Sequence, residues 1–272
     1  MGRLRKISMR EALAAVAALA FLFSVWKIGA YALDGYASKK TYGEIRSVYY
    51  GPPEELAYAP PAPNDPVPHP APAEKRAVNP KFGPLLERNG DVVGWVRIAG
   101  TRIDYPVAQA EDNEYYLHRG VDGERSAAGS IFMDYRNDAG GTNRNTVLYG
   151  HDMKNKTMFA DLVEYESRWN FENRTIVEFD TLYAEGKWEI FSAYTTSSSF
   201  DYIRTEFDSD EDFGQFLDVV KGKSLHASDV EVSAKDTILT LSTCSSAFAD
   251  ARFVVHAKLL PQGRQEEGDN RE

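Results

Sequence analysis

The chain contains one cysteine, and its setting makes it a candidate nucleophile. Cys244 ends a strand-like run in the segment TLSTCSS, where its neighbours carry hydroxyl groups instead of apolar side chains. A thiol with an ordinary pKa is mostly protonated at neutral pH, and a nearby imidazolium or guanidinium favours the thiolate, which is the attacking form. One cysteine, one histidine and one arginine could therefore perform acyl transfer without a metal or cofactor. A buried packing role is the alternative for a lone cysteine.

Partners for the thiol are available at strand ends. His151 follows the run NTVLYG and opens the turn HDMKNK, and Arg252 lies eight positions after Cys244 in DARFVVHAKL. Catalytic groups concentrate in such turns. The other histidines lie in a Pro-rich segment, two predicted surface turns and a strand interior, namely His69, His118, His226 and His256. Residue types alone favour His151 without deciding among the five.

The amino terminus predicts an exported, membrane-anchored protein. Residues 1–11 are basic, and the apolar stretch over 12–33 is interrupted by Lys27 alone. About 20 apolar residues span a bilayer as a helix, and the positive-inside rule keeps the basic end in the cytoplasm. A cleaved signal peptide is the alternative, because residues 30–32 (AYA) resemble a cleavage site, although the stretch is long for one. Outside the cell, an unpaired thiol is open to oxidation and gives no disulfide in return, which favours a working Cys244.

Composition divides the exported part into three segments. Residues 34–79 join a charged, aromatic juxtamembrane stretch, predicted to be helical over 36–50, to a Pro-rich segment with ten of the thirteen prolines between Gly51 and Pro80. This segment predicts a polyproline-II-like spacer. A globular unit follows over 80–261, and the polar tail 262–272 is predicted to be disordered. The net charge of −10 argues against nucleic-acid binding.

Short strands dominate the globular unit. Strand-like runs separated by Gly, Asn and Asp turns lie at 92–98, 101–109, 114–117, 130–135, 145–150, 175–183, 188–196, 236–244 and 251–260. This pattern favours a β-barrel or sandwich over a doubly wound sheet.

Helical patterns occur at 80–90, 157–165 and 208–221. The last opens with alternating aspartates, but Phe213 and Val219 stand where a calcium loop requires Gly and Glu. Ser209 with Asp212 instead resembles a capping box. No metal site is predicted.

These segments together resemble class B sortases. TLSTC (240–244) followed by Arg252 resembles the family's Cys-strand-Arg signature, and NTVLYGHDMKNKTMFADL (145–162) is similar to its His segment. The segments 92–109, 112–120 and 129–134 resemble class B text in the same order, so the match covers roughly residues 80 to 260. The resemblance implies a mainly β fold, an eight-stranded sortase-type barrel with N-terminal helices and a helix inserted before the Cys strand. One departure is Ser245, where class B sequences often have an acidic residue.

The same resemblance implies a cysteine transpeptidase. Its catalytic residues would be Cys244, His151 and Arg252, with Ser242 and Thr243 supporting the site and no cofactor. The substrates would be exported proteins with a C-terminal sorting signal of the Asn-Pro-x-Thr type, and the acceptor an amine of a peptidoglycan precursor (lipid II) or a pilin. The enzyme would cross the membrane once, with its N-terminus cytoplasmic and its catalytic domain extracellular.

Two other functions fit parts of the pattern. An L,D-transpeptidase also uses Cys, His and Arg, but in a GCxR-like text, whereas Cys244 and Arg252 are eight positions apart. Papain-like peptidases place Cys before His in the chain, the reverse of the order here. A non-enzymatic wall-associated module, with Cys244 merely structural, is the third possibility. A thiol-reactive probe separates the enzyme from that module, since a structural cysteine resists labelling.

Overall fold

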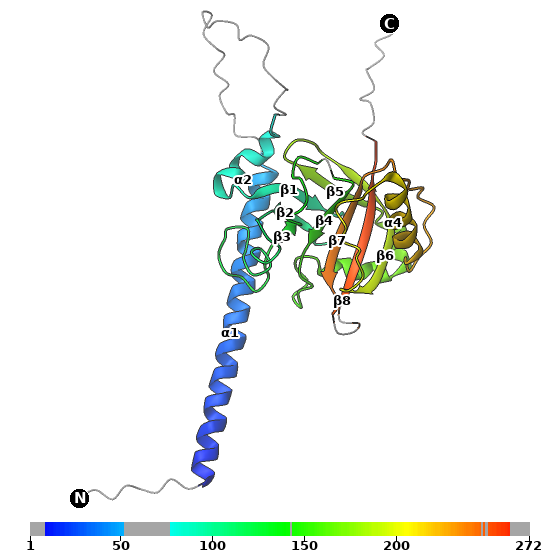
Figure 1. The fold of residues 1–272 in the computed structure, drawn as a ribbon. Helices are drawn as coiled ribbons and strands as arrows, with labels where there is room; N and C mark the ends of the chain where they lie inside the picture. The colour runs from blue at the N-terminus through cyan, green and yellow to red at the C-terminus, as the bar shows by residue number, and fades with distance from the viewer. Residues whose placement is uncertain (1–8, 52–76, 142, 246, 248–249, 262–272) are drawn as a thin grey trace, which may run out of the picture.

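A closed β-barrel forms the globular unit in this computed structural model, which describes residues 9–51, 77–141, 143–245, 247 and 250–261 (Figure 1). Its strands are β1 (Val92–Arg97), β2 (Asp104–Ala108), β3 (Ile131–Met133), β4 (Asn145–Tyr149), β5 (Ile176–Thr181), β6 (Lys187–Ser197), β7 (Ile238–Cys244) and β8 (Ala251–Leu259). Their order around the barrel is β1-β2-β3-β4-β7-β8-β6-β5, and β5 closes on β1. The predicted eight-stranded barrel is confirmed.

One of the predicted strands is absent. Residues 114–117 form turns instead, because the side chain of Asp112 accepts hydrogen bonds from the backbone N–H groups of Glu114 and Tyr115 and bends the chain. Tyr116 then points inward, and its hydroxyl donates to Asp91 at 2.8 Å. A local side-chain bond to the backbone has outcompeted strand pairing in this segment.

Helices surround the barrel at three places. The segment predicted over 80–90 forms η1 (Pro80–Phe82) and α2 (Gly83–Arg88), and the one over 157–165 forms η2 (Ala160–Glu166), followed by α3 (Arg168–Asn173). The helix predicted before the Cys strand is α4 (Asp210–Gly222), and Ser209 caps it by accepting from the backbone N–H of Asp212 at 3.1 Å. The Asp212 carboxylate does not complete a capping box and instead pairs with Arg204.

Two apolar layers hold the strands. The barrel interior is filled by alternate residues of the strands, including Leu239 and Leu241 of β7 and Phe253 and Val255 of β8. On the outer face of β6, β7 and β8, a second layer packs under α4 and contains Phe191, Tyr194, Phe213, Phe216, Leu217, Val220, Ile238 and Val254. Alternation along β7 therefore sends odd-numbered side chains inward and even-numbered ones towards α4.

His256 lies in this second layer and has a structural role, as its mid-strand position predicted. It is fully buried, and its ring nitrogens bond to the hydroxyls of Tyr194 (2.8 Å) and Thr240 (2.9 Å). Burial disfavours the charged imidazolium and lowers the pKa of His256 from 6.5 to about 3.

This shift predicts acid sensitivity. Below about pH 6.5 the unfolded chain binds a proton at this imidazole and the folded chain does not. The contribution of His256 to stability is therefore complete above that pH and is lost as pH falls towards about 3. The contribution of His256 to the slope of the unfolding free energy against pH approaches about 1.4 kcal/mol per pH unit. Urea unfolding of the wild type and of His256→Gln between about pH 6.5 and pH 4.5 measures it. A variant with the same slope as the wild type would contradict this assignment.

The N-terminal helix is longer than predicted and joins the barrel. α1 runs without a break from Met9 to Tyr49, and it is the one helix of the described residues long and apolar enough to cross a membrane. Its last turns bury Tyr42, Ile45 and Tyr49 in the barrel core, and the Tyr49 ring stacks on Trp95 at 4.1 Å. The folded unit thus includes residues before position 80, where composition placed its start. The Pro-rich segment and the C-terminal tail, for which a spacer and disorder are predicted, lie outside the described residues at 52–76 and 262–272.

Candidate active site

Two parallel strands bring His151 and Cys244 to one end of the barrel. β4 pairs with β7 in parallel, with Tyr149 opposite Ser242, and the backbone N–H of Gly150 donates to the carbonyl of Ser242 at 3.2 Å. His151 and Cys244 each lie two residues beyond that pair. Parallel strands end at the same edge of a sheet, and every second residue shares a face, so both side chains belong to the outer face at this edge.

Arg252 reaches the same place from the other side. β7 and β8 are antiparallel, and Cys244 opposite Arg252 is their last pair before the connecting turn. Directly opposed residues in an antiparallel pair project to the same face. Cys244 is exposed and Arg252 is half-buried. The barrel therefore gathers the three residues that the sequence singled out, from strand ends far apart in the chain.

His151 is oriented by the turn that replaced a predicted strand. Its Nε2 lies 2.8 Å from the carbonyl oxygen of Leu117. A carbonyl only accepts hydrogen bonds, so Nε2 carries a hydrogen, and Nδ1 is the nitrogen left to gain or lose a proton. Gly150 is required immediately before it, because a Cβ there would collide with Ile131 and Phe159.

Ser242 and Thr243 lie on opposite faces of β7. The Ser242 hydroxyl, on the Cys244 face, bonds to the Tyr202 hydroxyl at 2.8 Å. Burial raises the pKa of Tyr202, and its bond to Ser242 and the positive charge of Arg252 oppose that rise, so Tyr202 lies within electrostatic range of Arg252. Thr243 instead pairs with Phe253, is buried, and has no partner for its hydroxyl in the described part of the chain. Strand alternation turns the Thr243 side chain into the barrel, away from the face of Cys244, and support of the site by Thr243 stays a prediction.

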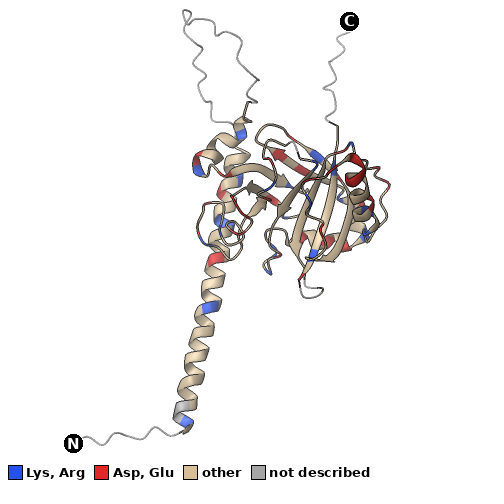
Figure 2. Ribbon diagram, viewed as in Figure 1, with Lys and Arg blue, Asp and Glu red and all other residues tan. Residues whose placement is uncertain are grey.

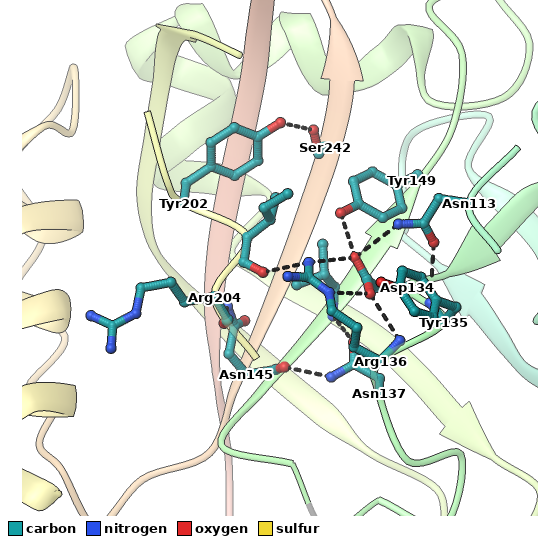
Figure 3. Close-up of polar contacts among 12 residues, drawn as sticks. Asn113, Asp134, Tyr135, Arg136, Asn137, Asn145, Tyr149, Tyr202, Arg204 and Ser242 are labelled. Carbon is teal, nitrogen blue, oxygen red and sulfur yellow. Dashed lines mark hydrogen bonds and ion pairs between the residues drawn. The ribbon is translucent and has the colours of Figure 1, made fainter. Parts of the chain in front are cut away.

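The buried carboxylate of Asp134 connects the segments next to the candidate site (Figure 3). Asp134 is fully buried and accepts two hydrogen bonds at 2.8 Å from the guanidinium of Arg136, one from Tyr149 at 2.7 Å and one from Asn113 at 3.1 Å. Arg136 also donates to the carbonyl of Ile203 at 3.0 Å. Burial alone would raise the pKa of Asp134, but the bonds from Arg136 and Tyr149 outweigh it and hold that pKa below its ordinary value.

This network connects three segments distant in sequence. It joins the turn at Asn113, the end of β4 two residues before His151, and the segment before α4 that carries Tyr202 (Figure 3). The sequence analysis missed it. The position of Tyr149 two residues before His151 could have indicated a shared face, whereas nothing in the local sequence links Asp134 to residue 203.

Replacing Asp134 with asparagine should destabilise the fold. The amide keeps one acceptor oxygen and turns a donor towards Arg136, leaving that guanidinium and the Tyr149 hydroxyl without full partners. Breaking a buried charged pair costs about 3–5 kcal/mol, and the partial exposure of Arg136 reduces this to about 2–3 kcal/mol. Urea unfolding measures the difference. The matched control is Asp218→Asn at an exposed position of α4, which should change stability by less than about 0.5 kcal/mol. Equal changes in unfolding free energy for the two variants would refute a stabilising role for Asp134.

Comparison with known proteins agrees with this geometry. A sortase domain model matches residues 96–260. The chain is 44% identical to sortase B of Staphylococcus aureus over 67% of this chain and 76% of that protein, and 36% identical to sortase B of Listeria monocytogenes over 88% and 92%. Among solved structures, sortase B from Bacillus anthracis in complex with AAEK1 superposes with a TM-score of 0.71 at 39% identity, covering 85% of this chain and 99% of that one.

A second solved structure carries a bound substrate. The Staphylococcus aureus sortase B-substrate complex superposes with a TM-score of 0.72 at 36% identity, covering 84% of this chain and 98% of that one. These similarities exclude the two alternative functions, an L,D-transpeptidase and a non-enzymatic wall-associated module. The matched residues include the strand ends that carry Cys244, His151 and Arg252. The chain belongs to the sortase family of cysteine transpeptidases, in class B.

Proposed function

We propose that Cys244, His151 and Arg252 catalyse transfer of an exported protein from its C-terminal sorting signal to an amine. The observation that carries the proposal is the terminal pair of Cys244 with Arg252 beside the end of β4. This arrangement offers an exposed thiol, a guanidinium and an imidazole. Ser242 supports the site by holding Tyr202 through the hydrogen bond between their hydroxyls.

The reaction proceeds in two acyl transfers. The Cys244 thiolate attacks the carbonyl of the signal's threonine, and Arg252 donates hydrogen bonds to the oxyanion that forms. His151, as imidazolium, gives a proton to the departing amine, which leaves a thioester on Cys244 and a neutral imidazole. The acceptor amine then attacks the thioester, and His151 takes its proton while the C–S bond breaks. The thiolate and imidazolium are restored, so no further reactant is needed.

Resemblance to the family supports a proposal for the substrate and the location. The proposed signal is of the Asn-Pro-x-Thr type, and the acceptor is an amine of the peptidoglycan precursor lipid II or of a pilin. Helix α1 crosses the membrane once, with residues 1–11 cytoplasmic and the catalytic domain outside. Anchoring keeps the enzyme where its substrates emerge and raises their effective concentration.

Peptide transfer assays test this function. The full chain is incubated with Asn-Pro-x-Thr peptides, Leu-Pro-x-Thr peptides and scrambled controls, with and without a panel of amines, and the products are analysed by mass spectrometry. The expected result is an acyl adduct on Cys244 from the Asn-Pro-x-Thr peptides alone, and its conversion to an amide when an amine is added. An adduct from every peptide would refute the proposed signal, and the absence of any adduct would refute the proposed reaction.

Arg252→Lys should be strongly impaired despite keeping the charge. Lysine presents a point charge without the planar fork that donates two parallel hydrogen bonds, so the oxyanion loses stabilisation. We expect transfer to fall by roughly 10²-fold, measured as kcat/KM with the preferred peptide. The conservative change should leave the fold intact, as judged by its urea midpoint. Activity within about threefold of the wild type would remove Arg252 from the proposed mechanism.

A further inference from the structure

Helix α1 meets the catalytic domain directly after its apolar stretch. Asp34 follows the stretch 12–33, and its carboxylate accepts a hydrogen bond from the backbone N–H of Ala127 at 3.0 Å. A Cβ added to Gly35 would lie 3.4 Å from Nδ2 of Asn155. The domain thus touches the helix at the first two residues beyond the apolar stretch, so no spacer separates the two.

The remainder of α1 fixes the domain in that position. The helix is continuous to Tyr49, and Tyr42, Ile45 and Tyr49 are buried in the barrel core. The Tyr42 hydroxyl donates to the carbonyl of Gly129 at 3.1 Å. A continuous helix packed along its length leaves no joint at which the barrel could swing away from the helix axis. The height of the barrel above the membrane is therefore set by where the apolar stretch ends.

Length places that end at the membrane surface. Residues 12–33 span about 33 Å at 1.5 Å per residue, close to the ~30 Å hydrocarbon thickness of a bilayer. Figure 2 shows this part of α1 with few charged residues, which become frequent where the helix meets the barrel. Asp34 then lies at the outer interface, and its bond from Ala127 and the approach of Asn155 to Gly35 bring both of these residues to the same level.

Asn155 belongs to the turn that follows the candidate catalytic histidine. The turn is closed by a bridge between Asp152 and Met158 and by hydrogen bonds from Lys156 N–H to the Met153 carbonyl and from Phe159 N–H to the His151 carbonyl. Its exposed residues are Lys154, Asn155 and Lys156; neither lysine forms an ion pair within 4.0 Å of another described residue, and Lys156 lies within electrostatic range of Asp152. Figure 1 shows the end of β7 and the start of β8 directed the same way as the N-terminal half of α1.

We propose that the catalytic end of the barrel faces the outer leaflet, and that Lys154 and Lys156 contact anionic lipid headgroups. The inference rests on the proposed membrane anchoring. Lysines held within a Debye length of an anionic surface are attracted to it, and a turn closed by backbone bonds presents them without further ordering. The membrane-facing turn also contains His151, so the bilayer surface forms one boundary of the space in which substrates approach Cys244.

Depth-dependent quenching in vesicles tests the placement. The full chain is reconstituted in a Cys244→Ala background, which removes its one cysteine, and a fluorophore is attached at a single new cysteine. The sites are Ala20→Cys within α1, Ala127→Cys at the proposed interface, and Lys235→Cys, which is exposed before the start of β7 at the opposite end of the barrel. The quencher is a headgroup-level spin label for positions 127 and 235 and a deep acyl-chain label for position 20.

The outcomes separate the placement from the anchoring. We expect quenching at positions 20 and 127 and none at 235. Quenching at 20 without quenching at 127 would overturn the placement while leaving the anchor intact. Absence of quenching at position 20 would overturn the anchor, and the placement with it.

A second comparison tests the two lysines. At position 127, brominated phosphatidylglycerol should quench at least about twofold more strongly than brominated phosphatidylcholine at equal mole fraction, because lysines enrich anionic lipid around the turn. The double variant Lys154→Gln and Lys156→Gln should lose this preference but keep the depth. Equal quenching by both lipids in the protein with its lysines would overturn the headgroup contact.

Discussion

Replacing Cys244 with alanine should abolish transfer. Without the sulfur no thioester can form, and the remaining groups do not offer an equivalent nucleophile at the same position. Loss of a catalytic nucleophile lowers kcat on the order of 10⁵-fold or more. The measurement is the rate of amide product formation by mass spectrometry, together with the disappearance of the acyl adduct and of labelling by a thiol-reactive probe.

Because Cys244 is exposed, its replacement should lower activity without lowering the stability of the fold. Because the thiol lies at the end of β7 and contributes little packing, the free energy of unfolding should change by less than about 0.5 kcal/mol. Ser245→Ala, one position further on, is the matched control and should retain most of the activity. If Cys244→Ala still formed product at more than about one per cent of the wild-type rate, the thioester mechanism would be wrong.

Replacing His151 with alanine should give the second-largest loss. Removal of a group that donates and accepts protons in the transition state costs about 10²–10⁴-fold in rate. The loss should appear in kcat for both the acylation and the amine-transfer steps. Single-turnover measurement of adduct formation and of adduct decay distinguishes the two steps.

Another histidine provides a control for His151. His226 is half-buried and bonds to the carbonyl of Glu166 at 3.0 Å, away from the strand ends that carry the site. His226→Ala should therefore keep activity within about threefold. Loss of the His151 bond to Leu117 costs about 1 kcal/mol of stability, so the assay is run where both variants are fully folded. Similar rates for the two variants would exclude His151 as the proton-transfer group.

Much of the barrel was predictable because its strands carry local signals. β1, β7 and β8 are apolar runs bounded by turn residues, and α4 has a polar cap before an apolar stripe. These signals are local, since propensity and alternation act over a few residues. The segment 114–117 shows their limit. An aromatic run reads as a strand, but one aspartate accepting backbone hydrogen bonds was sufficient to turn it.

The extent of α1 was not predictable from composition. A charged, aromatic stretch after an apolar one predicts only a short juxtamembrane helix, because nothing local marks Tyr42 and Tyr49 as core residues. Their burial depends on Trp95 and the turn at Gly129, which come from elsewhere in the chain. A tertiary contact therefore joined helix α1 and the catalytic domain into one body.

By itself, the sequence predicted which groups react, because one thiol and its family-specific neighbours are properties of residue type and order. Only the tertiary structure decided which side chains share a face. The parallel pairing of β4 with β7 placed His151 beside Cys244, and strand alternation turned Thr243 into the barrel while Ser242 stayed at the site. The Asp134 network likewise exists only in the folded chain, because its members come from three separate segments and a buried carboxylate is stable only when all of them surround it.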